Sequence, residues 1–418
     1  MRRRRFYDKT LVLFLCLVAA PAVAWADGAA LSTSLVGGRV QLDFRGQYRA
    51  RFLFNTGKDF KVGNNSETVA QRARFGMSLS YMDRLSFFFQ VQDVRTWGEE
   101  KDTLGTYNAN GFDLHQAFGQ VRIVDRLFVR IGRQELSLDN ERLIGAVDWS
   151  MQARSFDGIR IYYDRDPYHA TIFYAKVGEE HALNNVFKRD RDLGVVHFRY
   201  SRLPYFEPSM LYVIDTDYAE KRVRHTMGVH LTGEVKGLNY TGEFYGQFGE
   251  VGDKTIKAFM GAVLVGYTIP HRLLRVNLGF DAWFEYLSGD RNPNDGDSKS
   301  FDTLFATNHR FYGYMDFFLN IPNDTINRGL MDIGGRIRLA PVSGMVIKVD
   351  YHYFQAPRRF SSGEVYLGSE VDVLVSYKVW RYLKLDAVYG VFIPHAAMKA
   401  LKGSGNEHLF YLTTDFQF

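Results

Sequence analysis

Residues 39–54 read RVQLDFRGQYRARFLF, and this stretch decides the fold class. From Val40 to Phe54 every second residue is apolar or small, and almost all residues between them are charged or polar. A period of two is that of a β-strand whose faces are chemically opposite. The alternation covers about three times the length of a usual soluble strand. The stretch therefore predicts a long strand with one apolar and one polar face.

The same alternation recurs along the chain, at residues 274–286, 345–353, 367–377 and 383–393, and in the final stretch 408–418, which ends on Phe418. Tight turns, such as 82–84, 236–237 and 341–344, alternate with long polar loops, at 55–69, 98–111, 137–153, 288–329 and 394–406. A soluble β-sandwich would have shorter strands and turns every 8–12 residues. Short turns on one side and long loops on the other are typical of an outer-membrane β-barrel.

The number of strands follows from parity. Nineteen segments look like strands, and one of them is residues 310–319. A barrel whose two ends both lie in the periplasm needs an even number of strands, so residues 310–319 are assigned to the long loop 288–329. The sequence thus predicts an all-β protein, a transmembrane antiparallel barrel of 18 strands with an aqueous lumen. We expect the aromatic loop 288–329 to fold over or into the pore.

Composition excludes several other classes. With a mean hydropathy of -0.23 and 15% aromatic residues, the chain is neither disordered nor a polytopic helical membrane protein, because it lacks runs of about 20 apolar residues. A formal net charge of +5 is too mild to indicate a nucleic-acid partner.

The first 26 residues have the pattern of a signal peptide. Arg2–Arg5 are basic, residues 11–23 are apolar, and Ala24-Trp25-Ala26 fits a cleavage site. We expect residues 27–418 to form the barrel channel and to reside in the bacterial outer membrane. Cleavage would remove Cys16, the single cysteine, so neither a disulfide nor a thiolate metal site is expected. The histidines show no metal-ligand spacing, and no cofactor or metal is predicted.

If apolar residues face lipid, the polar residues between them face the pore. This places a set of arginines in the lumen, namely Arg39, Arg45, Arg49, Arg51, Arg72 and Arg74, with Arg336 and Arg338 later in the chain. Arginine stays charged, and its planar guanidinium suits carboxylates. We expect several of these arginines to form a wall that attracts anions.

Later strands carry acids on their polar faces, namely Glu243, Asp281, Glu285, Glu370 and Asp372. Acids opposite arginines predict a field across the lumen. The alternative is that the charges pair with one another across a wet pore. Trp97, Trp149 and Trp380 lie near predicted strand ends, as an interfacial aromatic girdle would.

Three blocks carry a resemblance to a known family. They are Gly132-Arg133-Gln134-Glu135-Leu136 with Arg142–Trp149 and Ala153–Gly158, then Phe301–Phe305 with Asn308–Asp316, and finally Leu367–Asp372. In these blocks the sequence resembles the alginate-export porin family. The resemblance implies a monomeric 18-stranded outer-membrane barrel with an arginine-rich constriction that passes a polyuronate by diffusion. It also implies that Arg133, Arg142 and Arg154 belong to that constriction. Alternatively, pairs such as Arg133 with Glu135 and Arg154 with Asp157 hold the loop in place.

Two functional classes remain open. One is a passive channel for an anionic polysaccharide or smaller organic anions, with membrane lipid and periplasmic export machinery as partners and no nucleic acid. The other is a barrel enzyme or receptor that acts on envelope lipids or small solutes. Catalytic residues are not predicted.

Overall fold

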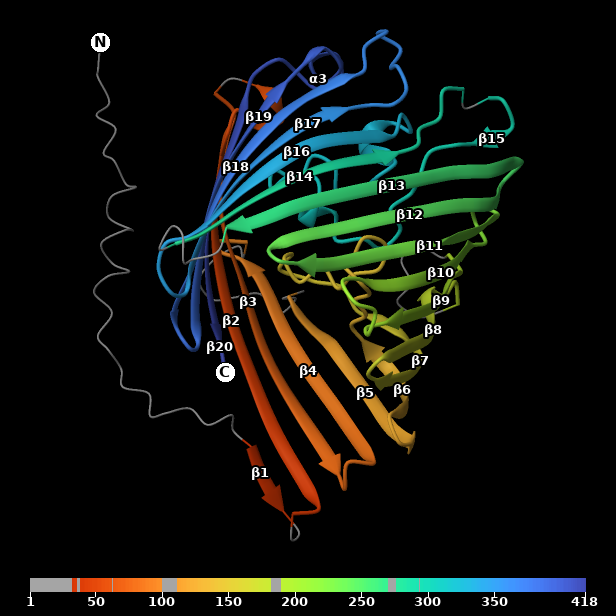
Figure 1. Ribbon diagram of the computed structural model, residues 1–418, viewed down its shortest axis with the longest axis vertical. Coiled ribbons are helices and arrows are strands. Elements are labelled where there is room, and N and C mark those ends of the chain that lie inside the picture. The colour runs from red at the N-terminus through yellow and green to blue at the C-terminus, as the bar shows by residue number, and fades with distance from the viewer. Residues whose placement is uncertain are drawn as a thin grey trace.

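The computed structural model describes residues 32–35, 38–61, 63–99, 111–181, 189–269, 276–292 and 294–418. The predicted signal peptide lies outside these residues. Within these residues one sheet of 20 strands closes on itself into a barrel (Figure 1). Eighteen of its strands are long and pair antiparallel, as predicted, and a two-residue strand, β15 (Asp297–Ser298), pairs in parallel with β13 (Lys254–Ile269). Within the described residues, no helix has the length and apolar character needed to cross a membrane.

The long strands follow one another around the barrel in chain order. The first nine are β2 (Val40–Thr56), β3 (Asn65–Tyr81), β4 (Leu85–Thr96), β5 (Phe112–Val124), β6 (Leu127–Gln134), β7 (Phe156–Arg165), β8 (Tyr168–Gly178), β9 (Arg191–Tyr200) and β10 (Glu207–Asp217). The other nine are β11 (Arg222–Val235), β12 (Leu238–Val251), β13 (Lys254–Ile269), β14 (Asn277–Leu287), β16 (Leu330–Ala340), β17 (Met345–Gln355), β18 (Tyr366–Trp380), β19 (Leu383–Pro394) and β20 (Glu407–Gln417).

The remaining elements are short. They are β1 (Ser32–Leu35), β15 (Asp297–Ser298), the helix α3 (Ala396–Leu401) and the 3-10 turns η1 (Lys58–Phe60), η2 (Asn308–Arg310) and η3 (Asn323–Thr325). Arg310 ends η2, and residues 311–319 form turns and irregular backbone, so their assignment to the loop was correct.

The barrel closes where β2 pairs with the last strand, β20. Beyond that ladder, the Phe418 amide donates to the Gly46 carbonyl at 3.0 Å, and the Gly46 amide donates to the Phe418 carbonyl at 3.1 Å. A Cβ at Gly46 would lie 2.1 Å from the Phe418 ring. A side chain at position 46 would therefore displace the terminal ring from this strand.

The outer wall is apolar, as the alternation predicts for a lipid-facing surface. Exposed side chains on this wall include Phe75, Ile131, Ile172, Phe244 and Val263. Trp97 and Trp380 are also exposed at strand ends. Trp149 is not part of such a girdle, and that prediction was wrong, because its ring stacks on His309 inside the barrel with centroids 3.6 Å apart.

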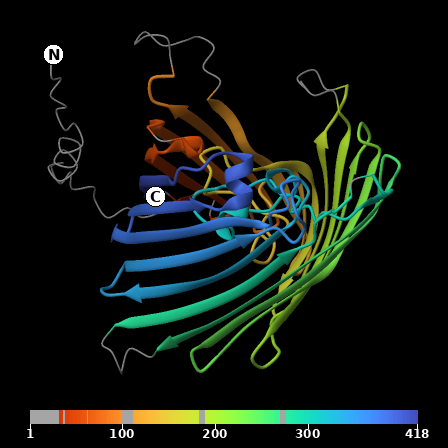
Figure 2. The ribbon, with the colours of Figure 1, turned by 90° about the horizontal axis from the view of Figure 1, so that it is seen from above.

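Two long loops lie inside the ring of strands (Figure 2). The first inner loop, residues 135–155, joins β6 to β7, and the second inner loop, residues 288–329, joins β14 to β16. They contact each other directly, because the Gly145 amide donates to the Phe305 carbonyl at 2.9 Å and the Phe305 amide donates to the Leu143 carbonyl at 2.9 Å. The expectation that the second loop folds into the pore is confirmed.

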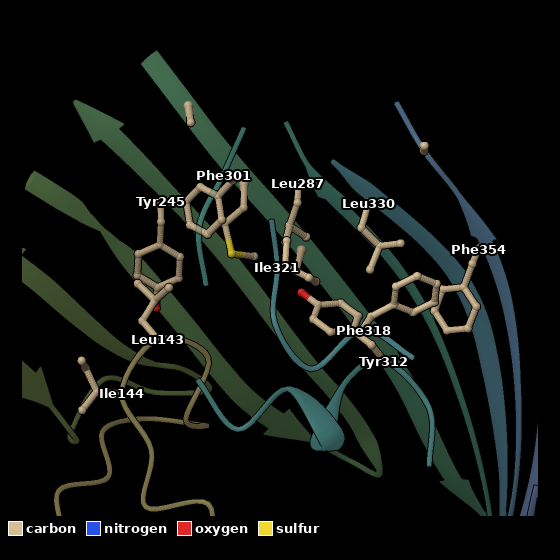
Figure 3. Packing of buried hydrophobic residues seen from close by; sticks show 14 of the residues in the cluster. Leu143, Ile144, Tyr245, Leu287, Phe301, Tyr312, Phe318, Ile321, Leu330 and Phe354 are labelled. Atoms are coloured by element: carbon tan, nitrogen blue, oxygen red, sulfur yellow. The ribbon is translucent and has the colours of Figure 1, made fainter. Parts of the chain in front are cut away.

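These loops bury an apolar core against the inner wall of β8 to β13 and against inward residues of later strands, such as Leu287, Leu330 and Phe354. Phe173, Leu193, Val195, Leu211 and Tyr245 point inward and are at most 5% exposed. Figure 3 shows Tyr245 close to Leu143 of the first inner loop and to Phe301 of the second inner loop, whereas Phe318 of the second inner loop lies farther along the wall, beside Phe354. The expectation of a polar inner face fails on this side, because the loops shield the wall from water and burial of apolar surface stabilises them there.

Candidate functional site

Four arginines lie side by side on the inner wall. β2 contributes Arg49 and Arg51, and β3 contributes Arg72 and Arg74. Arg49 and Arg72 are direct partners in the antiparallel register. Residues that are two apart in a strand share a face, so the period-two pattern brings all four together. We call Arg49, Arg51, Arg72 and Arg74 the arginine cluster. Adjacent like charges repel, so the cluster requires anionic or carbonyl partners.

Asp148 of the first inner loop supplies the central anion. Its carboxylate accepts from Arg72 Nη2 at 2.9 Å, from Arg74 Nη1 at 3.0 Å and from Arg49 Nη2 at 3.3 Å. Arg49 also donates through Nε to Asp415 of β20 at 2.7 Å. A single carboxylate thus bridges three guanidinium groups, an arrangement in which charge-assisted hydrogen bonds are strong.

Backbone carbonyls of the first inner loop satisfy further donors of the cluster. Arg49 donates to the Asp148 carbonyl at 2.6 Å, Arg51 to the Trp149 carbonyl at 2.9 Å and Arg72 to the Ser150 carbonyl at 3.1 Å. The guanidinium of Arg51 also lies 4.7 Å from the centroid of the Trp149 ring. The main chain at residues 148–150 is therefore fixed to the arginine wall independently of the Asp148 carboxylate.

Burial differs sharply within this group. The side chains of Arg49, Arg72 and Arg74 are at most 9% exposed, whereas that of Asp148 is 52% exposed. Partial burial disfavours the charged form of Asp148, but the neighbouring arginines outweigh this and hold the pKa of its carboxyl below its usual value. Asp148 is therefore ionised at neutral pH.

A cavity of about 250 Å³ adjoins the cluster. Its polar lining includes Arg45, Gln47, Arg74, Gln90 and Asp148. The guanidinium of Arg45 makes no ion pair among the described contacts and lies 5.9 Å from the Phe88 ring. The cavity thus combines two arginines with amide side chains, which suits a small anionic group.

The first inner loop also reaches the opposite wall, through Arg142. Its guanidinium donates to Glu285 of β14 at 2.7 and 2.9 Å and to Glu243 of β12 at 3.4 Å, and it lies 3.5 Å from the Phe311 ring centroid. Burial disfavours the charged guanidinium, but the two carboxylates outweigh this and hold the pKa of Arg142 well above its usual value. Arg142 therefore anchors the loop rather than presenting a free positive charge.

The second inner loop is docked by charged side chains of the wall, one arginine and two acids. Asp302 pairs with Arg224 of β11 at 2.6 Å. The Met315 amide donates to Glu370 at 2.8 Å, and the Tyr314 amide donates to Asp372 at 3.2 Å. These two predicted lumen acids hold a loop backbone.

The other predicted residues fall into separate places. Arg336 pairs with Asp350 at 2.6 Å and Arg338 with Asp281 at 2.8 Å, both across neighbouring strands. The expected field between an arginine wall and an acidic wall is therefore reduced, because most acids have a cation beside them. Arg39 lies in the turn before β2, at the rim, and not on the strand.

Arg133 and Arg154 do not reach the arginine cluster, and the pairs expected for them were wrong. Arg133 shares the outer face of β6 with the exposed Ile131 and pairs with Asp157 at 3.1 Å. Glu135 instead contacts His115 at 2.6 Å. Arg154 donates to the carbonyls of Gly145 and Phe305, and burial lowers its pKa to about 10.

Sequence reasoning missed Asp148 as a site residue. The residue stands in the Arg142–Trp149 block that carries the family resemblance, next to Trp149. The available signal was an acid that stands in this block of a long loop, because consecutive arginine-bearing strands need anionic partners. Its significance appears only once the loop is seen to fold inward.

The closed antiparallel barrel, its apolar belt and its inward loops define an outer-membrane barrel of the porin class. The family model for alginate export matches residues 40–323 of the 418. The chain therefore belongs to the alginate-export family, in agreement with the resemblance. No curated protein matches it.

Solved structures with the same fold are outer-membrane porins. OccAB4 of Acinetobacter baumannii aligns with a TM-score of 0.63 at 13% identity, covering 94% of this chain and 100% of its own. OprD of Pseudomonas aeruginosa aligns with a TM-score of 0.62 at 13% identity, covering 93% and 97%. OccK5 (OpdH) of the same organism aligns with a TM-score of 0.59 at 10% identity, covering 90% and 98%. At these identities the likeness concerns the fold.

Proposed function

We propose that this barrel is a passive channel for carboxylate-bearing solutes, such as segments of a polyuronate or smaller organic anions, and that the arginine cluster attracts them. The observation that carries this proposal is the bridging of three guanidinium groups by the Asp148 carboxylate. Arginine binds carboxylates through a rigid, permanently charged fork, which suits it to recognise uronates.

The pairing of the acids supports an anion preference. Arg142 neutralises much of the charge of Glu243 and Glu285, while Arg338 and Arg336 lie against Asp281 and Asp350. Because these acids have cations beside them, they repel a passing anion less than free carboxylates would. The arginine cluster carries four positive charges against Asp148 and Asp415 as its direct anionic partners, with Glu135 3.8 Å from Arg74.

The magnitude of the effect is modest for each residue. A pair of unit charges at contact is worth about 1 kcal/mol in water and about 4 kcal/mol near a protein surface, and 0.1 M salt screens it beyond about 10 Å. Several arginines acting together would therefore produce a several-fold preference for anions rather than strict exclusion of cations.

The test is the reversal potential of the reconstituted channel under a salt gradient. We compare the wild type with a variant in which Arg45, Arg49, Arg72 and Arg74 are all changed to Gln. The wild type should be anion-selective and its current should be blocked by oligouronates, and the variant should lose both properties. Retention of the folded, heat-modifiable gel band in the variant controls for misfolding.

Two results would contradict the proposal. Equal anion-to-cation permeability ratios in the wild type and the variant would show that the arginines do not set the selectivity. A wild type that forms no conducting pore would favour the other class, a barrel enzyme or receptor that acts on envelope lipids or small solutes.

A further inference from the structure

Asp148 occupies the position that a solute carboxylate would need in order to reach the arginine cluster. Arg49, Arg72 and Arg74 are almost fully buried, and Asp148 is the half-exposed member of the group. A solute that approaches from the adjoining cavity therefore meets the Asp148 side chain before it meets most of the guanidinium surface.

We propose that the Asp148 carboxylate is an exchangeable internal ligand of the arginine cluster, which a solute carboxylate must displace, and which thereby selects for solutes with several carboxylates. This inference rests on the proposed function, because it concerns the same arginines. It assigns to Asp148 a specificity-determining role.

The geometry allows the exchange without release of the loop. Carbonyls of Asp148, Trp149 and Ser150 accept from Arg49, Arg51 and Arg72 at 2.6 to 3.1 Å, and these contacts do not involve the carboxylate. Rotation of the side chain towards the cavity of about 250 Å³ would free donors of three guanidinium groups while the backbone stays docked. The incoming carboxylate would accept the same hydrogen bonds.

Selection for several carboxylates follows from competition. Asp148 is tethered beside the arginines, so it competes at an effective concentration in the millimolar range or above. A solute with a single carboxylate must exceed that concentration to displace it. In a chain with a carboxylate on each sugar, a neighbouring carboxylate can bind the arginines as soon as one dissociates. The high local concentration of these carboxylates offsets that of Asp148.

The experiment measures current block by galacturonate and by an oligogalacturonate in the wild type and in Asp148→Asn. The amide keeps the size of the side chain but removes its charge. We expect the half-blocking concentration of galacturonate to fall roughly tenfold in the variant, and that of the oligomer to fall less. The matched control is Asp157→Asn, which removes an arginine-paired carboxylate from the outer face and should leave both values unchanged.

The outcomes separate this inference from the proposed function. Block of the wild type by the oligomer together with unchanged values in Asp148→Asn would overturn the internal-ligand role alone. Absence of any block in both proteins would overturn the proposed function and this inference with it. If Asp148→Asn conducted both the anion and the cation of the salt better than the wild type, with no gain in galacturonate affinity, Asp148 would merely dock the loop. That result would also overturn the inference.

A second comparison does not depend on the folding of the amide variant. Asp148→Glu keeps the charge and should keep the wild-type ratio between the half-blocking concentrations of monomer and oligomer. In the wild type itself the monomer should block at least a hundredfold more weakly than the oligomer. If galacturonate and the oligogalacturonate had similar half-blocking concentrations when these are expressed per carboxylate, selection through competition with Asp148 would be refuted.

Discussion

Replacement of Arg142 by Met should release the first inner loop from the opposite wall. The guanidinium is 4% exposed and contacts Glu243, Glu285 and the Tyr312 hydroxyl, with Phe311 against its face. Methionine fills a similar volume but leaves two buried carboxylates without a cation. Breaking a buried ion pair from one side costs about 3–5 kcal/mol, because the remaining charge is uncompensated. We therefore expect local opening of the loop to become easier by about that amount.

Amide hydrogen exchange reads this opening directly. The Gly145 amide donates to Phe305, and the Leu138 amide donates to Ile144. If exchange proceeds through local opening, a loss of about 3–5 kcal/mol accelerates these amides by roughly two to three and a half orders of magnitude, at about 1.4 kcal/mol for each factor of ten. Amides in the ladder between β2 and β3, far from the contact, should exchange at the wild-type rate.

A charge-balanced variant provides the control. Combining Arg142→Met with Glu243→Gln and Glu285→Gln removes the buried charges together, and a buried ion pair can often be replaced at little cost. Most of the protection at Gly145 should then return. The reasoning is refuted if the single variant accelerates exchange less than tenfold, or if the triple variant exchanges as fast as the single one.

The remaining predictions concern other contacts of the barrel and the loops. Gly46→Val should lower the yield of folded barrel several-fold on heat-modifiability gels, because a Cβ there meets the Phe418 ring at 2.1 Å; a normal yield would contradict the closure described here. Gly313→Ala places a Cβ 2.2 Å from Glu370 Oε1 at a positive φ of 84°, a strain of about 1–3 kcal/mol, so exchange of the Met315 amide should accelerate roughly tenfold, and wild-type exchange would refute it. The arginines hold the pKa of Asp148 below its usual value of about 3.9, so the stabilisation that its charge gives the loop is present above that value and lost as pH falls through the lowered pKa. Because carbonyls of residues 148–150 keep the loop backbone docked, protonation should free guanidinium donors without releasing the loop. Below pH 4 the anion-to-cation permeability ratio should therefore rise more steeply in the wild type than in Asp148→Asn, and identical pH profiles of the two proteins would argue against the ion pairs.

The barrel itself could be predicted from the sequence because a membrane imposes a strict pattern. Lipid on one side makes every second residue apolar, and the stretch from Val40 to Phe54 shows this without ambiguity. The even strand number followed from placing both ends of the barrel in the periplasm. The conformation of residues 310–319 was not needed for it, only their position within a long loop.

The interior could be predicted only in part. Where loops fold inward, the inner wall faces protein instead of water, and its side chains can be apolar. Phe173, Val195 and Leu211 break the alternation, since both faces of their strands are apolar, and each belongs to the buried core that includes residues of the inner loops. Arg142 reads as a constriction residue until the loop is seen to cross the lumen. The sequence did allow the orientation of Arg133 to be predicted. Arg133 is two residues from the apolar Ile131, and residues two apart in a strand share a face.

Efflux of a labelled oligouronate from liposomes that contain the purified barrel tests the central claim most directly. The oligomer should leave vesicles that contain the wild-type protein. Vesicles with the variant lacking Arg45, Arg49, Arg72 and Arg74 should release it several-fold more slowly while still passing small neutral sugars. Complete retention of the oligomer by vesicles with folded, conducting wild-type barrel would contradict the account.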